Sequence, residues 1–124
     1  MQSIKKIDFS DIEKYVIDAK KSGLIFCNKT ILYGLFIDDK IVGFTGIIFY
    51  KNKAIFKNHY VPIINRGKGY FVTLLDYSMR LCFQMGIKNI EATCTKMSLS
   101  QYIKKGFIII KQYKLYTKVR HENL

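Results

Sequence analysis

A short glycine-rich segment, residues 65–71 (NRGKGYF), constrains this chain more than any other feature of its sequence. It follows a run rich in β-branched and aromatic residues, 53–61, and precedes a run with helical spacing of apolar residues, 70–85. A glycine turn between a strand and a helix lets backbone N–H groups at the positive end of the helix dipole approach a phosphate. Arg66 and Lys68 add positive side chains at the same place. The segment therefore predicts an α/β fold with an anion-binding turn.

Size and composition favour one domain that spans residues 1–124 and has a single core. Nine Phe and nine Tyr supply bulk for that core, so disorder is not expected. The longest apolar run, 41–50, is too short to cross a bilayer, and the first residues lack the apolar segment of a signal peptide. The three cysteines, Cys27, Cys82 and Cys94, show no metal-ligand spacing. We therefore expect a cytoplasmic protein with reduced, buried thiols and no metal.

The formal net charge of +12 is distributed unevenly along the chain. Residues 1–39 hold six acidic and six basic residues, whereas residues 40–124 hold three acidic and fifteen basic ones. Such an excess predicts a field that attracts an anion, whether a nucleotide cofactor, nucleic acid or an acidic protein. However, 18 of the 21 basic residues are Lys, which the codon usage of an AT-rich genome also produces, and Arg is the better phosphate and groove binder. Composition alone leaves both explanations open.

Periodicity and turn residues predict the order of the elements. The motif Ser10-Asp11-Ile12-Glu13 resembles a capping box, with Ser10 as the N-cap of a helix that ends at Gly23. The remaining pattern predicts a mixed sheet flanked by helices, in the order β-β-β-α-β-α-β-β. The expected strands are 31–37, 40–50, 53–61, 87–95, 107–110 and 115–119, and the expected helices are 70–85 and 98–105.

Three motifs in this order resemble the GCN5-related N-acetyltransferase (GNAT) superfamily. Residues 66–70 (RGKGY) are similar to the family's acyl-CoA signature, Gln/Arg-x-x-Gly-x-Gly/Ala, at a strand-to-helix turn. Residues 102–107 (YIKKGF) are similar to its Tyr-x-x-x-Gly-Phe, and residues 40–44 (KIVGF) to its second hairpin strand. The resemblance covers about residues 30–120. It implies a GNAT-like sheet with a shortened N-terminal part, and an acyl-CoA-dependent N-acyltransferase with acetyl-CoA as donor.

The resemblance also implies a set of cofactor-binding residues. Backbone N–H groups of the turn would hold the pyrophosphate, and the end of the preceding strand would pair with pantetheine. The family's final Gly/Ala is Phe71 here, whose N–H still serves a phosphate if its ring turns into the core. Thr95 stands where the family commonly has Asn, so the contact of the amide would either be lost or be replaced by one from the hydroxyl. The implied residues are Tyr60, Val61, Arg66, Gly67, Lys68, Gly69, Tyr70, Phe71 and Thr95.

The catalytic residues follow from the chemistry of the implied reaction. An amine that attacks a thioester must lose a proton, and the departing thiolate must gain one. The resemblance places Tyr102 near the sulfur as the acid, although the same ring could simply pack against a strand. No carboxylate lies in the strand 53–61, which leaves His59 and Glu91 as candidate bases. Either residue could instead be structural, and loss of the proton to ordered water needs neither.

The acceptor is an amine that the sequence does not identify. A small-molecule or peptide amine is the expectation for the superfamily. Its rival is a nucleic-acid acceptor, as in the phage-type Mom DNA-modification proteins, or a catalytically inactive module that binds nucleic acid. The tail 111–120 favours this rival, because it alternates basic residues with Tyr113 and Tyr116. Such spacing could set cations on phosphates and rings against bases.

Overall fold

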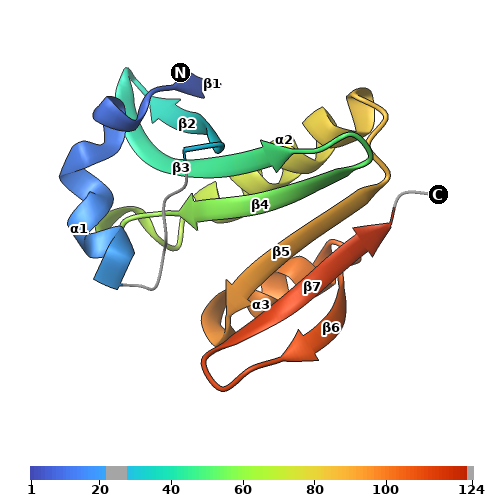
Figure 1. Cartoon of the computed structure of the whole chain (residues 1–124). Helices are drawn as coiled ribbons and strands as arrows, with labels where there is room; N and C mark the ends of the chain where they lie inside the picture. The colour runs from blue at the N-terminus through green and yellow to red at the C-terminus, as the bar shows by residue number, and fades with distance from the viewer. Residues whose placement is uncertain (22–27, 123–124) are drawn as a thin grey trace.

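The computed structural model describes residues 1–21 and 28–122 of the chain (Figure 1). Seven strands form one mixed sheet in the order β1-β2-β3-β4-β5-β7-β6, in which β4 and β5 are parallel and the other neighbours antiparallel. The strands are β1 (Gln2–Ile7), β2 (Ile31–Ile37), β3 (Lys40–Phe49), β4 (Lys53–Tyr60), β5 (Asn89–Thr95), β6 (Ile108–Gln112) and β7 (Tyr116–Glu122). The helices are α1 (Glu13–Lys21), α2 (Tyr70–Gln84) and α3 (Lys96–Lys104), and two 3₁₀ turns span Phe9–Ile12 and Ile63–Asn65.

The helices cover the two faces of the sheet unequally. One core cluster joins α2 and α3 to the sheet, through residues such as Leu75, Tyr102 and Phe56. A second cluster, on the other face, joins the N-terminal helical segment to β3 and β4. Consequently the face of β4, β5 and β7 that points away from α2 and α3 has no helix over most of its length (Figure 1). Among the described residues, no helix is both long and apolar enough to cross a membrane.

Helix α2 follows directly from its sequence pattern. Leu74, Leu75, Ser78 and Cys82 are buried at helical spacing, and the Ser78 hydroxyl donates to the Leu74 carbonyl at 2.9 Å, which allows a polar residue in the core. Gly86, with a φ of 76°, follows the helix in the left-handed region, as the sequence predicted. Met85, the last residue of the run 70–85 that the sequence predicted as helical, is 55% exposed and does not belong to the buried face.

Two N-terminal expectations are corrected by the structure. Residues 2–7 form the edge strand β1, which pairs with β2, whereas the sequence pattern indicated no strand there. Only Ile7 of this strand is fully buried, so its apolar alternation is too weak to predict. The helical segment also begins earlier than Ser10, because Asp8 is its N-cap and the Asp8 N–H donates to the Asp11 carboxylate at 2.8 Å. The expected helix end at Gly23, and Cys27, lie outside the described residues.

A bulge in β4 decides which side chains reach which face of the sheet. Phe44 of β3 pairs with Tyr60 and Gly46 pairs with Lys57, so β4 carries one extra residue between these pairs. Asn58 lies in this interval with a φ of 59°. As a result Phe56 packs toward α2, whereas Tyr60 packs toward α1, although the two are four residues apart on one strand.

The bulge predicts an inverted order of stability for two small substitutions. Within regular elements a protein with alanine is normally more stable than one with glycine. In the left-handed conformation, however, a Cβ atom costs about 1 kcal/mol. We therefore expect Asn58→Gly to be more stable than Asn58→Ala by roughly that amount in urea denaturation. Both variants lack the Asn58 side chain, so their difference isolates the backbone. An Ala variant as stable as the Gly variant would contradict the bulge.

Candidate functional site

Strands β4 and β5 separate at their carboxyl ends, and the site is built around this separation. Their parallel pairing runs from Lys53 with Asn89 to Phe56 with Ala92 and stops there. Residues 57–60 of β4 and 93–95 of β5 continue as strands without pairing with each other (Figure 1). The sheet ladder therefore does not use the backbone N–H and C=O groups on these facing edges.

The chain leaves β4 through a turn that side chains hold in place. Arg66 Nε donates to the Val61 carbonyl at 2.7 Å, and its guanidinium carbon lies 5.7 Å from the centre of the Tyr60 ring. Asn65 Nδ2 donates to the Val42 carbonyl at 3.3 Å. These contacts bring Arg66, on the protein surface, next to the end of β4. The Val61 carbonyl keeps a second lone pair for another donor.

The glycines open the start of α2 to solvent. Gly67 and Gly69 have φ values of 80° and 82°, and a methyl group on either would meet no protein atom within 4 Å. Helical bonding begins when the Thr73 N–H donates to the Gly69 carbonyl at 3.0 Å. The N–H groups of residues 70–72 therefore have no acceptor within the helix. No acidic residue lies between Asp39 and Asp76 in the sequence, so this turn suits an anion such as a diphosphate.

Three aromatic side chains from three elements meet behind the separated strands. The His59 ring of β4 stacks on the Phe71 ring of α2, with centroids 4.0 Å apart and an interplanar angle of 22°. The Tyr102 ring of α3 lies edge-on to both, at 6.0 Å from Phe71 and 6.5 Å from His59. The Phe71 ring thus points into the core, which leaves its backbone at the surface of the turn. His59 reaches this cluster because the bulge at Asn58 turns it toward the helices.

His59 is held in its neutral form. Its Nε2 lies 3.0 Å from the Phe71 carbonyl oxygen, and because a carbonyl can only accept, Nε2 carries the proton. Its Nδ1 is buried and has no hydrogen-bond partner within the described residues. Burial lowers the pKa of His59 to about 4, against a smaller upward effect of the bond to Phe71. A group with this pKa accepts a proton poorly near neutral pH.

Tyr102 lies deep in the aromatic cluster, with 3% of its surface exposed. Its ring meets the Phe107 ring edge-on at 5.2 Å. Burial raises the pKa of the Tyr102 hydroxyl above its ordinary value, and the nearby Cys94 adds to the rise. The hydroxyl is therefore protonated near neutral pH and can act as a hydrogen-bond donor.

Glu91 lies on the opposite face of the sheet from Tyr102. Ile90, Ala92 and Cys94 of β5 point into the core beneath α2 and α3, so alternation turns Glu91 the other way. Its carboxylate pairs with Lys118 at 3.1 Å and with Lys53 at 3.2 Å. Burial alone would raise the pKa of Glu91, but the two lysines outweigh it and lower the pKa.. The structure does not bring Glu91 together with His59 or Tyr102.

Thr95 has a structural task at the start of α3. It is the N-cap of that helix, and its Oγ1 accepts from the Ser98 N–H at 3.4 Å. The Ser98 hydroxyl lies 3.2 Å from the same oxygen. The Thr95 hydroxyl is exposed and close to the end of β5, but two contacts already occupy it. The cap explains why a residue with a short side-chain oxygen stands at this position.

The open face carries a shallow hollow that the sequence analysis did not predict. Its volume is about 360 Å³, and β4, β5, β7 and the turn before β7 contribute to it. It could be predicted only with the knowledge that β7 lies between β5 and β6, which no local pattern gives. The lining residues are Ile55, Lys57, Glu91, Ala92, Thr93, Tyr113, Tyr116 and Lys118. Within residues 1–21 and 28–122, no group of His, Cys, Asp and Glu could hold a metal ion.

Comparison with solved structures identifies the fold. The PaiA N-acetyltransferase of Thermoplasma acidophilum, solved with coenzyme A, superposes with a TM-score of 0.81 at 17% identity, over 99% of both chains. A GNAT-family acetyltransferase of Staphylococcus aureus gives 0.77 at 16% identity, over 98% of this chain and 99% of that one. An acetyltransferase of Bacillus subtilis, also solved with coenzyme A, gives 0.75 at 13% identity, over the whole of both. No family model matches the sequence, and no curated protein matches it.

The chain therefore has the GNAT fold, as the three motifs predicted. The mixed seven-stranded sheet and its three helices agree with that architecture. At these identities the likeness establishes the arrangement of the elements. What the site does must be argued from its own residues.

The partly buried and neutral His59 predicts a loss of stability in mild acid. An unfolded His titrates near 6.5, so the unfolded chain binds a proton that the folded chain refuses until about pH 4, and stability falls as the pH drops through this window. From about pH 7.5 to about pH 5 the loss from His59 should be about 2 kcal/mol. The His59→Gln variant should lose less by that amount in urea denaturation. His121, whose pKa burial also lowers, is present in both proteins and cancels. Equal losses would contradict the assignment.

Proposed function

We propose that this protein is an acyl-CoA-dependent N-acyltransferase that transfers an acetyl group from acetyl-CoA to an amine. One observation carries the proposal. The separated carboxyl ends of β4 and β5 lie directly beside an open glycine turn at a helix start. The first offers unpaired strand edges to an extended ligand, and the second offers N–H groups to an anion. A thioester joined to a diphosphate by a flexible arm fits both features, since the arm can pair with the strand edges and the diphosphate can accept from the N–H groups. The fold neighbours solved with coenzyme A support this choice.

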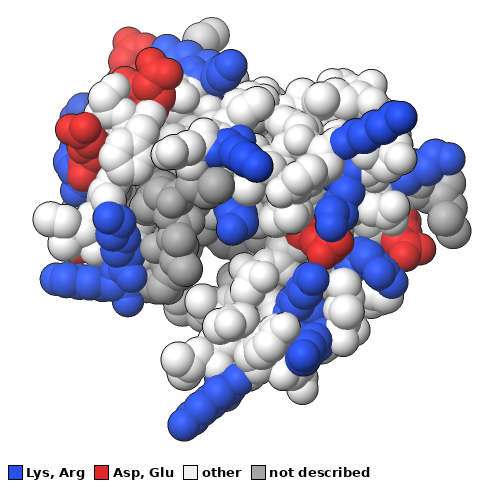
Figure 2. Space-filling model, in the orientation of Figure 1, with Lys and Arg blue, Asp and Glu red and all other residues white. Residues whose placement is uncertain are grey.

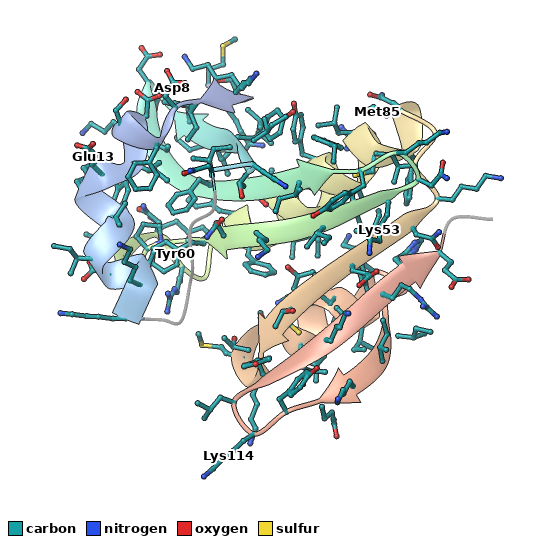
Figure 3. All side chains as sticks on the ribbon, in the orientation of Figure 1. Asp8, Glu13, Lys53, Tyr60, Met85 and Lys114 are labelled. Atoms are coloured by element: carbon teal, nitrogen blue, oxygen red, sulfur yellow. The ribbon has the colours of Figure 1, made fainter. Side chains whose placement is uncertain are left out.

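The residues present fit such a donor. The N–H groups around Gly69, Tyr70 and Phe71 would bind the pyrophosphate, with Arg66 and Lys68 supplying charge. The backbone of Tyr60 and Val61 would pair with the pantetheine arm as an additional strand edge. Figure 3 shows Tyr60 at the end of β4, beside the N-terminal helix. When bound, the donor supplies an acyl carbonyl that an amine can attack.

The protein contributes mainly position and hydrogen bonding. Tyr102, as a protonated hydroxyl near the separated strands, would donate to the leaving sulfur. The raised pKa of Tyr102 makes full transfer of its proton hard unless the sulfur is equally shielded from water, as it would be if it lay beside this buried ring. His59 has a low pKa and Glu91 is committed to two lysines, so we infer that the amine proton leaves to water.

Donor binding is testable by calorimetry with acetyl-CoA and with coenzyme A. We expect binding to the wild type, and a loss of about tenfold or more in affinity for Arg66→Ala, since charge-assisted hydrogen bonds contribute about 1.5–3 kcal/mol. Gly69→Val should lose at least as much, because a side chain there blocks the approach of the phosphate.

Gly86→Val is the matched control for that experiment. Gly86 also has a φ in the left-handed region, lies at the other end of α2, and has open space around it. Both valine variants should lose similar stability, but only Gly69→Val should lose the ligand. If folded wild-type protein binds neither compound at millimolar concentration, the enzyme proposal fails.

Tyr102→Phe tests the proposed chemistry. Loss of the hydroxyl should lower kcat by about tenfold or more and leave KM for acetyl-CoA nearly unchanged, because the donor bond forms to the departing sulfur. Release of free thiol with an amine that the wild type acetylates is the measurement. A kcat equal to the wild type would make Tyr102 a packing residue.

A second candidate function is favoured by the charge distribution. The protein could direct its acylation to nucleic acid, as Mom-type proteins do, or bind nucleic acid with this fold and without catalysis. The two tyrosines and the lysines of the tail 111–120 support this candidate. Nucleoside mass spectrometry after incubation of DNA or RNA with acetyl-CoA separates the two forms, since only the first produces an acylated base.

A further inference from the structure

We propose that the hollow on the open face, with the adjoining β6–β7 turn, binds single-stranded nucleic acid. If the protein is an acyltransferase, this hollow is the side from which the acceptor approaches, and that part of the proposal rests on the proposed function. The binding of nucleic acid does not depend on it.

The hollow has more positive charge than its one carboxylate can balance. Glu91, with 15% of its side chain exposed, is paired with both Lys53 and Lys118. Lys57, also in the lining, makes no ion pair within the described residues. Lys57 and Lys118 of the lining, together with Lys53 paired to Glu91 from outside it, exceed the single carboxylate by two positive charges. Figure 2 shows this face, where Lys and Arg side chains spread over the β5–β7 region around a few acidic ones, and further acidic side chains lie at the N-terminal end.

Two exposed tyrosines form a platform at the rim of the hollow. The Tyr113 and Tyr116 rings lie 4.8 Å apart, tilted by 35°, and are 42% and 45% exposed. The Tyr113 N–H donates to the Tyr116 carbonyl at 2.8 Å, which fixes the turn that carries them. Lys111 Nζ lies 5.1 Å from the centre of the Tyr113 ring. Solvent-exposed rings with adjacent cations suit a base and its phosphate, since stacking contributes about 1–3 kcal/mol per base.

The position of the hollow links it to the separated strands. Ile55 and Glu91, which line it, form the second-last pair of the β4–β5 ladder. A base in the hollow would therefore lie next to the point where the two strands diverge, on the face opposite α2 and α3. The donor turn begins α2, so donor and acceptor would approach the gap from different sides.

The spread of the lysines favours a polymer over a small anion. Lys111 and Lys114 lie on β6 and the turn, outside the hollow, and Lys114 marks the far tip of that turn in Figure 3. One phosphate cannot contact all of these ammonium groups at once. The flexible single strand also exposes base faces to the tyrosines, which a duplex keeps stacked.

The test is fluorescence anisotropy with a labelled single-stranded oligonucleotide of about 12 nucleotides, titrated at several salt concentrations without acyl-CoA. We expect a dissociation constant of roughly 10⁻⁴–10⁻⁶ M that rises steeply with salt. Combined Lys111→Ala, Lys114→Ala and Lys118→Ala should reduce the log–log salt slope by about 2. Combined Lys51→Ala, Lys88→Ala and Lys104→Ala remove equal charge away from both the hollow and the β6–β7 turn, and should change the slope little.

Two acidic residues give a sharper comparison. Glu91→Gln frees Lys53 and Lys118 and should tighten binding about threefold at about 0.1 M salt and steepen the slope. Asp76→Asn changes the net charge equally, but Asp76 is on α2 and pairs with Lys105 at 2.7 Å. It should leave binding unchanged. Tyr113→Leu with Tyr116→Leu should weaken single-strand binding about tenfold and duplex binding much less.

Several results would overturn the proposal. Equal gains from Glu91→Gln and Asp76→Asn would mean diffuse attraction without a site. Equal affinity for duplex would contradict stacking of bases on the two tyrosines. Equal affinity for mononucleotides would contradict recognition of a polymer. No binding at low salt would end it. Because no acyl-CoA is present, these failures are distinct from a failure of donor binding in calorimetry, which would leave a nucleic-acid-binding GNAT fold.

Discussion

The interruption of the β4–β5 ladder is the constraint on which the rest of this structure depends. Four residue pairs join the strands, and one extra residue at Asn58 then turns the remainder of β4. A parallel ladder that continued would have used the edge groups of both strands internally. Because it stops, backbone groups at the end of β4 stay available beside the glycine turn. The same bulge brings His59 against Phe71 and Tyr102, and Tyr60 against the N-terminal helix.

Local patterns predicted most of the fold because most of its elements are locally encoded. Strands β2 and β3 and helix α2 begin at the residues that alternation and glycine positions indicated. Strand β1 was missed, since Lys5 and Lys6 weaken its pattern and its pairing with β2 holds it in place. The first N-cap was placed at Ser10, although Asp8 supplies it, because several polar residues near that point could serve. Capping among neighbouring candidates is decided by the backbone path, which sequence alone does not give.

The candidate site divides in the same way. The glycine turn could be predicted, because left-handed glycines and a helix start are properties of adjacent residues. That His59 and Glu91 lie on opposite faces of the sheet could not be predicted. Alternation within one strand does not show which face of the sheet the helices cover. The bulge at Asn58, which turns His59 toward the helices, has no clear sequence signal. The hollow depends on β7 being inserted beside β5, a contact between segments more than twenty residues apart.

Glu91 shows how the two faces can serve different chemistry. A lone carboxylate in a basic hollow would neutralise part of the attraction for an anion, yet it also fixes Lys53 and Lys118, which would otherwise repel each other and swing into solvent. A partly buried carboxylate between two ammonium groups keeps its charge, which its lowered pKa reflects. The ordered cations therefore offset only part of the attraction for an anion that this carboxylate removes. On the helix face the aromatic cluster carries no charge, because His59 is neutral and Tyr102 protonated. The charge of the proposed donor would therefore meet only the backbone, Arg66 and Lys68. Charge on one face and uncharged donors on the other would keep an anionic acceptor away from the cluster around Tyr102 until its amine enters the gap.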